Sequence, residues 1–360
     1  MNNTICLCMI VKDEEKVIER CLESVKPFID HFVVVDTGST DRTKEVVSWS
    51  LRDIPGEIYD RPWVNFGHNR SEALELARKT KTDYSLVLDA DDIFQAESFS
   101  KDLSDDAYYI EIESGPIKYN QLRLFTNSLP WEYVGAVHEY PVCSCSGIYG
   151  KLDFVNILSL HDGNSWSDPN KYRRYALMFE NELLKCPTEP RNVFYMAQCY
   201  KDCGDIQRAI EGYEARCKLA GWLDEVWYSL YQLGRLYEQK GENEKAISYY
   251  LDAYGHNFTR AEPLYELCRL YRQANKFQLG YAFGKMALSL PVPKEGIFIM
   301  PDAYGKCLYD ELSICAYYVG KYKESLELCK KALREGHPDP RRILANKQFA
   351  MKALGKSDGF

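Results

Sequence analysis

The chain has 360 residues, which is long for one small domain and predicts two domains, each with its own hydrophobic core. Its 45 Lys and Arg against 53 Asp and Glu give a net charge of −8, which argues against nucleic-acid binding through a broad basic surface but does not exclude a local basic groove. No apolar stretch approaches the ~20 residues of a membrane span, and residues 5–11 run directly into KDEEK, so we expect a cytoplasmic protein without a signal peptide.

Strand and helix patterns alternate through the first part of the chain. Apolar runs predict strands over residues 4–11, 31–36, 57–63 and 84–88, and helical spacing predicts helices over 14–25, 42–50 and 69–80. Such alternation is typical of a mostly parallel sheet covered by helices. Further strands are expected near residues 107–113, 121–126 and 154–160.

Three carboxylates follow the apolar run that ends near residue 88, in the sequence LVLDADD. Asp89, Asp91 and Asp92 would each be costly to desolvate at the end of a buried strand unless paired or metal-bound. A hard divalent cation, Mg²⁺ or Mn²⁺, shared with a phosphate satisfies them, and ligands of α/β sheets bind at this end of the strands. On the residues alone, an N-cap with a solvated first turn remains an alternative.

After residue 168 the strand patterns end and an internal repeat begins. Tyr200, Gly204, Ala209 and Tyr213 recur 37 residues later as Tyr237, Gly241, Ala246 and Tyr250. Two degenerate copies follow, with Asn275 or Gly320 at the turn position, and residues 341–354 predict a closing helix. Residues 190–335 therefore resemble tetratricopeptide repeats, an all-α solenoid of helical hairpins. Such a solenoid binds a partner on its concave face, and a purely structural or dimerising role is the alternative.

Four segments of the first part resemble the family 2 glycosyltransferases of the GT-A fold. They are MIVKDEE (9–15), VVVDTGSTD (33–41), NFGHNRSEAL (65–74) and LVLDADD (86–92), and the resemblance covers roughly residues 4–165. It implies an α/β GT-A nucleotide-sugar domain over residues 1–168, followed by a tetratricopeptide-like solenoid over residues 169–360.

The resemblance assigns donor-binding roles to several side chains. It implies that Asp36 binds the nucleobase, that Arg70 contacts the nucleotide, and that Asp91 is the main metal ligand beside Asp89. Val11, Lys12 and Ala90 complete the nucleotide-sugar site. Two alternatives remain from the residues: Asp36 as a cap of the next helix and Lys12 as ordinary surface charge. Arg70, in the first turn of a predicted helix, is unfavourable for the helix dipole, which favours a functional reason for it.

The catalytic base is harder to place. In WEYVGAVHEYP (131–141), Glu139 is the predicted base and His138 is predicted to orient the acceptor, with a surface ion pair for Glu139 and a strand cap for His138 as alternatives. Downstream, His161 is predicted to complete the metal set, against a buried structural role. The family resemblance implies that the basic segment with Lys171 covers the diphosphate, and Trp166 is a candidate lid residue.

We therefore expect a hexose to be transferred with inversion from a nucleotide diphosphate sugar, UDP-linked, in the presence of Mn²⁺ or Mg²⁺. The acceptor is expected to be a protein, a glycan or a modified nucleic-acid base, and the repeats are expected to bind it or to form a homodimer. A catalytically inactive domain that serves as a scaffold for the repeats is the alternative. A sugar-phosphate nucleotidyltransferase would need a glycine-rich phosphate loop where this chain has KDEEK.

Overall fold

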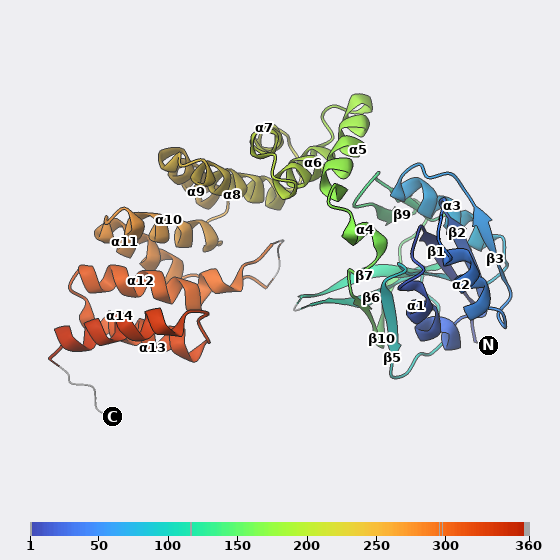
Figure 1. Ribbon diagram of the computed structural model, residues 1–360, viewed down its shortest axis with the longest axis horizontal. Coiled ribbons are helices and arrows are strands. Elements are labelled where there is room, and N and C mark those ends of the chain that lie inside the picture. The colour runs from blue at the N-terminus through green and yellow to red at the C-terminus, as the bar shows by residue number, and fades with distance from the viewer. Residues whose placement is uncertain (1, 116, 295, 297, 356–360) are drawn as a thin grey trace. The chain divides into compact units, whose positions relative to one another are not determined.

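The computed structural model describes residues 2–115, 117–294, 296 and 298–355. It divides into two compact units, Met1–Glu182 and Leu183–Phe360. The predicted order, an α/β domain with a mostly parallel sheet followed by helical repeats, is confirmed, and the sheet is mixed with mostly parallel strands (Figure 1). The predicted boundary at residue 168 lies within the first unit, just before α5 (Lys171–Lys185). No helix of the described residues is long and apolar enough to cross a bilayer.

The first unit contains an eight-stranded sheet in the order β3-β2-β1-β4-β7-β6-β10-β5. Pairing is parallel from β3 to β4 and between β6 and β10, and antiparallel where β7 meets β4 and β6 and where β5 meets β10. The strands are β1 (Ile5–Val11), β2 (His31–Asp36), β3 (Gly56–Asp60), β4 (Tyr84–Val87), β5 (Asp92–Ala96), β6 (Ala107–Ser114), β7 (Ile117–Thr126) and β10 (Tyr149–Ser159). A separate two-stranded sheet pairs β8 (Glu132–Val134) with β9 (Tyr140–Val142).

Helices cover both faces of the parallel strands. Ile5, Leu7 and Met9 of β1 pack in one core with α1 (Ile18–Val25) and α2 (Thr43–Ser50), whereas Cys6 and Cys8 pack in another with α3 (Phe66–Arg78). Burial on both faces explains why β1 reads as a continuous apolar run. The unit also contains η1 (Lys26–Phe28), α4 (Asn164–Ser167) and most of α5, up to Glu182.

Some element boundaries differ from the predicted ones. The helix expected from residue 14 begins only at Ile18, after a turn in which Asp13 has a φ of 54°. The helix expected from residue 69 begins at Phe66, because Asn65 caps it by accepting the His68 N–H at 2.7 Å. Arg70 therefore lies in the second turn of α3. The prediction that it lies in the first turn, where a cation is unfavourable for the helix dipole, was wrong.

The second unit consists of stacked helical hairpins. Its helices are α6 (Pro190–Asp202), α7 (Ile206–Cys217), α8 (Leu223–Gln239), α9 (Asn243–His256), α10 (Glu262–Gln273), α11 (Phe277–Leu288), η2 (Pro301–Tyr304), α12 (Lys306–Tyr318), α13 (Tyr322–Arg334) and α14 (Pro340–Ala353). The predicted turn positions Gly204, Gly241, Asn275 and Gly320 have φ of 81°, 77°, 57° and 78°. This left-handed backbone explains the repeated Gly or Asn.

A segment between α11 and α12, residues 298–304, lies across three successive hairpins. The Phe298 ring stacks on Tyr228 of α8 with centroids 4.0 Å apart and lies 6.3 Å from Phe194 of α6. The Met300 N–H donates to Glu262 of α10 at 3.2 Å. Because Phe194, Tyr228 and Glu262 are spaced by 34 residues, the segment contacts the same position of three consecutive repeats. The chain thus covers part of this repeated face with its own residues.

Candidate active site

The carboxyl ends of β1, β2 and β4 meet at one edge of the sheet, because these strands are parallel neighbours. A pocket of about 870 Å³ opens there, entirely within the first unit. Most of the predicted site residues line it: Val11, Lys12, Arg70, Asp89, Ala90, Asp91, His138, Glu139 and His161. Asp36 does not line the pocket itself, although its neighbour Thr37 does.

Asp36 ends β2 with a buried carboxylate. Its Oδ1 accepts the N–H groups of Gly38 at 3.0 Å and Ser39 at 2.9 Å, so it orders the turn after the strand and does not cap α2. Its Oδ2 is buried without a hydrogen-bond partner among the described residues. A buried acceptor of this kind is costly unless a donor arrives from elsewhere.

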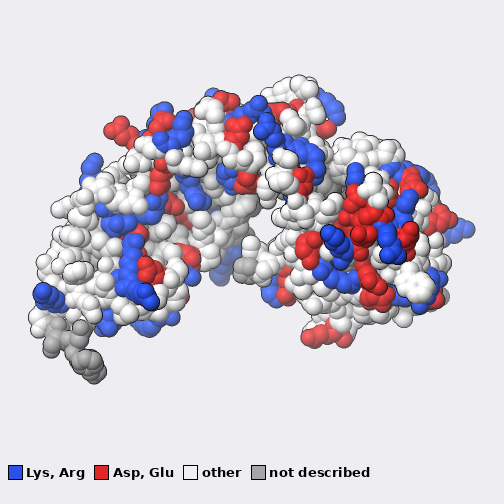
Figure 2. All heavy atoms as spheres, in the orientation of Figure 1, with Lys and Arg blue, Asp and Glu red and all other residues white. Residues whose placement is uncertain are grey.

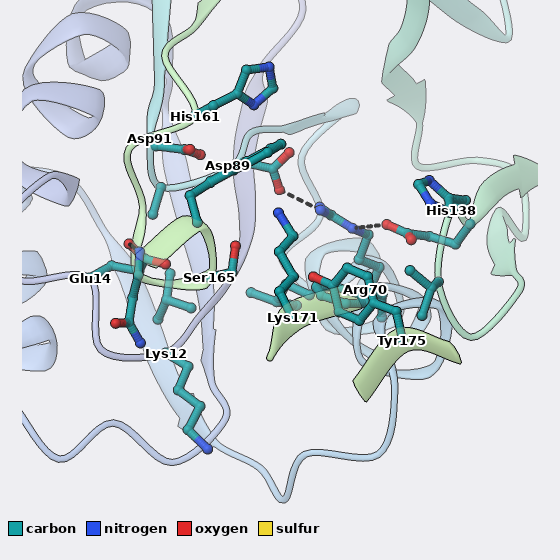
Figure 3. A pocket seen from close by; sticks show the side chains of 18 of the residues that line it. Lys12, Glu14, Arg70, Asp89, Asp91, His138, His161, Ser165, Lys171 and Tyr175 are labelled. Carbon is teal, nitrogen blue, oxygen red and sulfur yellow. Dashed lines mark hydrogen bonds and ion pairs between the residues drawn. The ribbon is translucent and has the colours of Figure 1, made fainter. Parts of the chain in front are cut away.

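The wall formed by the end of β1 is mainly backbone. The carbonyl of Val11 accepts both the N–H of Thr37 at 2.9 Å and its Oγ1–H at 3.1 Å, which joins the ends of β1 and β2. Lys12 is exposed, and in Figure 3 its ammonium points away from the carboxylates of the pocket. Ala90, by contrast, is buried between Asp89 and Asp91.

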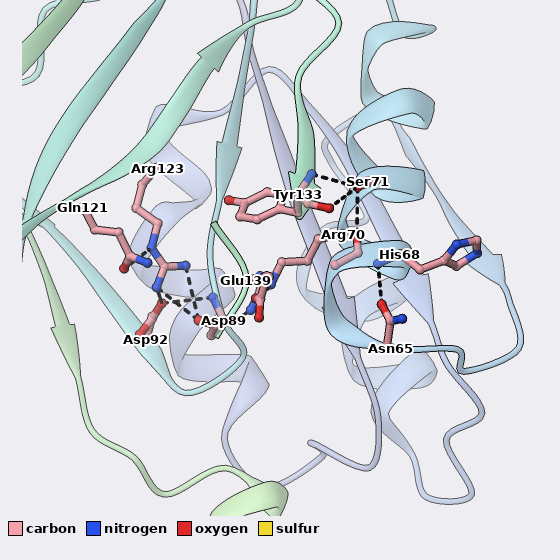
Figure 4. Close-up of polar contacts among 11 residues, drawn as sticks. Asn65, His68, Arg70, Ser71, Asp89, Asp92, Gln121, Arg123, Tyr133 and Glu139 are labelled. Carbon is pink, nitrogen blue, oxygen red and sulfur yellow. Dashed lines mark hydrogen bonds and ion pairs between the residues drawn. The ribbon is translucent and has the colours of Figure 1, made fainter. Parts of the chain in front are cut away.

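Two buried arginines hold Asp89 between them (Figure 4). Arg70 contacts Oδ1 through Nη2, and both terminal nitrogens of Arg123 donate to Oδ2 at 3.2 Å. Burial would raise the pKa of Asp89, but the two guanidinium groups outweigh it and hold the pKa well below its usual value. Arg123 was not among the predicted site residues, because it lies within β7 and carries no local motif.

Arg70 also binds the predicted base. Its Nε donates to Oε1 of Glu139 at 2.6 Å, and the Glu139 side chain is only 13% exposed. The Nη1 of Arg70 is buried and has no partner among the described residues. The loop that carries Glu139 fits closely on α3, because a Cβ at Gly67 would lie 2.2 Å from the carbonyl oxygen of Gly135.

His138 precedes Glu139 in a left-handed conformation, with a φ of 52°. Its ring is exposed and lies parallel to the Phe179 ring of α5, with the centroids 6.3 Å apart. His138 and Glu139 both line the pocket, so the two residues of the predicted pair lie at the same wall. Figure 3 shows the His138 side chain there.

Asp91 faces a second carboxylate across Gly163. Its Oδ2 accepts the Gly163 N–H at 3.3 Å, while Oε2 of Glu14 accepts the Asn164 N–H at 3.0 Å. A Cβ at Gly163 would lie 3.0 Å from Glu14 Oε2 and 3.3 Å from Asp91 Cγ, so glycine keeps this space open. Burial, together with the nearby acidic groups, raises the pKa of Glu14 to about 7. Glu14 lies in the MIVKDEE segment, but no role was predicted for it.

The three predicted metal ligands do not form a ready set. Asp89 is occupied by arginines, and His161 contacts the hydroxyl of Ser114 through Nε2 at 2.7 Å, with its ring 4.3 Å from Trp166. Among the described residues, no three His, Cys, Asp or Glu side chains gather in a way that could hold a metal ion. Asp91 alone presents a carboxylate that is bound only by a long backbone contact.

Lys171, the first residue of α5, places a buried ammonium in the pocket (Figure 3). Its Nζ lies 3.1 Å from the centroid of the Trp166 ring and about 6 Å from those of Tyr172 and Tyr175. The residue is 7% exposed, and burial lowers the pKa of Lys171. Within the described part of the chain no carboxylate forms an ion pair with it, so the Trp166 ring and the more distant charges of Asp91 and Asp168 stabilise the ammonium.

Comparisons with known proteins agree with this architecture. Residues 6–104 match the model of glycosyl transferase family 2, and residues 229–264 match a tetratricopeptide repeat model. Glycosyltransferase SunS of Bacillus phage SPbeta is 28% identical over 214 residues, which are 54% of this chain and 49% of that protein. A TPR repeat-containing protein of Synechococcus elongatus is 32% identical over 146 residues, 38% of this chain and 34% of its own.

An uncharacterized glycosyltransferase of Rickettsia bellii is 32% identical over 119 residues, which are 33% of this chain and 36% of that protein. The chain thus spans between a third and a half of the length of these relatives. The glycosyl transferase match lies in the unit that contains the sheet and the pocket, and the tetratricopeptide match lies in the unit of stacked hairpins. The chain therefore carries a family 2 glycosyltransferase domain followed by tetratricopeptide repeats.

Proposed function

We propose that the protein is an inverting hexosyltransferase that takes its sugar from a nucleotide diphosphate donor, UDP-linked, bound in the pocket at the ends of β1, β2 and β4. The observation that carries the proposal is a set of three groups at this edge of the sheet: a buried acceptor without a partner on Asp36, beside the pocket, and a buried donor without a partner on Arg70 and a buried cation on Lys171, both in its lining. A nucleotide diphosphate offers a base N–H, hydroxyl acceptors and phosphate charge, which match these three groups.

In this proposal each side chain acts on one part of the donor. Oδ2 of Asp36 accepts the N–H of the base, and the ends of β1 and β2 form the wall against which the base lies. Arg70 donates from Nη1 to the nucleotide, while Asp89, which is itself held by Arg123, keeps the Arg70 guanidinium in place. Lys171 and the positive end of α5 face the diphosphate and stabilise its charge as it departs.

A divalent cation fits this arrangement with fewer protein ligands than predicted. Mg²⁺ commonly binds through one or two carboxylates together with substrate phosphates, and Asp91 supplies such a carboxylate at the pocket. Mn²⁺ or Mg²⁺ held by Asp91 and the diphosphate would neutralise charge on the leaving group. His161 and Asp89 are engaged by Ser114 and by the arginines, so we assign neither a direct metal contact in this arrangement.

Glu139 is proposed to take the proton of the acceptor. Arg70 holds its Oε1, so Oε2 is the atom that would receive the proton, and His138 beside it would orient the acceptor.

For the acceptor, a protein or glycan is favoured over a modified nucleic acid. On the face drawn in Figure 2, acidic and basic side chains are interspersed, as expected for a chain of net charge −8. A homodimer through the repeats remains part of the proposal.

The second candidate is an inactive domain that serves as a scaffold for the repeats. It is favoured by the fact that Arg70 binds both Asp89 and Glu139, because one carboxylate oxygen of the predicted base is then already occupied by the arginine.

Nucleotide release separates the two candidates. The protein is incubated with a panel of nucleotide diphosphate hexoses and Mn²⁺, and the released nucleotide diphosphate is measured. We expect one UDP-linked sugar to be hydrolysed in preference to the others. Absence of hydrolysis, with UDP binding by calorimetry retained, would favour the scaffold, and absence of both would overturn the site itself.

A further inference from the structure

β7 has an open edge beside the pocket. β6 pairs with β7 from Ile117 onward, but β4 pairs with β7 only at Leu124, Phe125 and Thr126. Among the described residues, no strand pairs with residues 117–122 on the side opposite β6. The chain after β4 turns away through Asp89 and Asp91 to β5, so the pocket lies where β4 would otherwise continue.

The register identifies which backbone groups face this edge. Two residues connect Ser114 with Ile117, so these two form the hydrogen-bonded pair that closes the hairpin. Hydrogen-bonded and non-hydrogen-bonded pairs alternate along an antiparallel ladder. Lys118 and Asn120 therefore belong to non-hydrogen-bonded pairs, and their N–H and C=O groups point away from β6. The side chains of the intervening Tyr119 and Gln121 line the pocket, so the open edge leads directly to the candidate active site.

The usual protection of an exposed strand edge is weak here. Ile117 is 61% exposed and Tyr119 is 45% exposed. Lys118 is the one charged residue of the open stretch, and its ammonium pairs with Glu113 at 2.5 Å and Glu111 at 3.5 Å, both on β6. Unpaired edges are ready templates for another strand, and natural proteins normally block them with charge, bulges or cover.

We propose that the acceptor is an extended polypeptide that pairs with residues 117–122 of β7 as an added strand and so brings one of its side chains over the pocket. The inference rests on the proposed function and selects among its acceptor classes. A row of alternating N–H and C=O groups is matched by another extended backbone, whereas a glycan or a nucleic acid has no such alternation. Strand addition supplies affinity through the main chain and leaves the side chain at the pocket to determine specificity.

The chemical step follows from this placement. A hydroxyl or thiol of the added strand attacks the anomeric carbon and forms the new bond to it. The bond between that carbon and the phosphate oxygen breaks, and its electron pair leaves with the nucleotide diphosphate. The proton of the nucleophile passes to Glu139, which lines the same pocket as Tyr119 and Gln121.

Proline substitution on the open edge tests the proposal. Lys118→Pro and Asn120→Pro each remove an outward N–H and keep the inward hydrogen bonds of the hairpin, whereas Lys118→Gln and Asn120→Gln change the side chain alone. The probe is a library of short synthetic peptides that carry Ser, Thr, Tyr or Cys, used with the sugar donor that the hydrolysis panel selects. We expect each proline to raise KM for the best-labelled peptide about 10-fold, as for the loss of one hydrogen bond. Donor hydrolysis and both glutamine variants should match the parent.

N-methylation of the peptide provides a second test that needs no protein variant. Methyl groups on alternate backbone nitrogens of the best-labelled peptide should reduce its labelling by the parent protein, and methyl groups on the intervening nitrogens should not. Strand addition would be overturned if neither set of methyl groups changed the labelling of the peptide. It would also be overturned if the peptide library stayed unlabelled while glycans or oligonucleotides were labelled. In those cases donor hydrolysis by the parent would leave the proposed function standing, whereas its absence would overturn both.

Discussion

The Nε atom of Arg70 donates a hydrogen bond to Oε1 of Glu139 over 2.6 Å, across 69 positions of the sequence. The same guanidinium contacts Asp89, so one buried cation joins the predicted base to the carboxylate at the end of β4. An arginine in this position fixes the orientation of both carboxylates, because its planar guanidinium presents its donors in a rigid fork. The wall on which acceptor and donor are expected to meet is therefore held by ion pairs.

Glu139→Gln should reduce transfer to the acceptor by about 10²–10⁴-fold, the usual loss for one proton-transfer group. UDP affinity should remain that of the parent, because the base acts on the acceptor. Initial rates and calorimetry on the same preparation measure the two effects. Glu132→Gln, an exposed carboxylate of β8, is the control. Unchanged transfer in the Glu139 variant would move the role of base to Asp92, Asp162 or a group supplied by the acceptor.

Asp91→Asn should abolish the Mn²⁺-dependent part of UDP binding, because the substitution removes an anionic ligand at nearly constant volume. Calorimetric titration of UDP with and without Mn²⁺ gives that part directly. Removal of the metal with a chelator should lower the UDP affinity of the parent to that of the variant. Asp102→Asn, an exposed residue outside the pocket, serves as the control. Equal Mn²⁺-dependent binding in parent and Asp91→Asn would show that another group holds the metal.

Asp89→Ala should lower the free energy of unfolding by roughly 3 kcal/mol, because it leaves Arg70 and Arg123 buried without their shared partner. We place the loss at the lower end of the range for a broken buried pair, since the Asp89 side chain is 33% exposed. Denaturant unfolding measures it. A variant as stable as the parent would mean that the two arginines find other partners.

Lys171→Met should weaken UDP binding by roughly 10–100-fold, the effect of losing a hydrogen bond from a charged donor. Uridine, which lacks phosphate, should bind parent and variant alike. Arg173→Met is the matched control, because Arg173 is exposed on the same helix and does not line the pocket. Equal losses for UDP and uridine would indicate that Lys171 only supports the local packing of Trp166.

A fragment of residues 1–185 should bind UDP, whereas a fragment of residues 1–168 should bind it weakly or precipitate. The shorter fragment lacks α5, which supplies Lys171 and Tyr175 to the pocket and buries Phe179. Solubility and calorimetry of the two fragments give the comparison. Equal UDP affinity of both would contradict the assignment of α5 to the donor site.

The sequence alone determined the elements that depend on local pattern. Buried strands and helical hairpins were predictable because apolar periodicity and the Gly or Asn turns act over a few residues, as the positive φ values of Gly204 and Asn275 bear out. The places of Asp36 and Asp91 were predictable for the same reason, since Asp36 is the last residue of β2 and Asp91 follows β4 by a few residues.

Only the tertiary structure decided which charges meet. Arg123 lies 34 positions after Asp89, and nothing local to β7 indicates that it will share that carboxylate with Arg70. Ion pairs of this kind depend on which strands become neighbours and in which register. Strand pairing is a non-local property, and a slip of one residue would move these side chains to the other face of the sheet. The open edge of β7 arises in the same way, because β4 is shorter than the strand beside it.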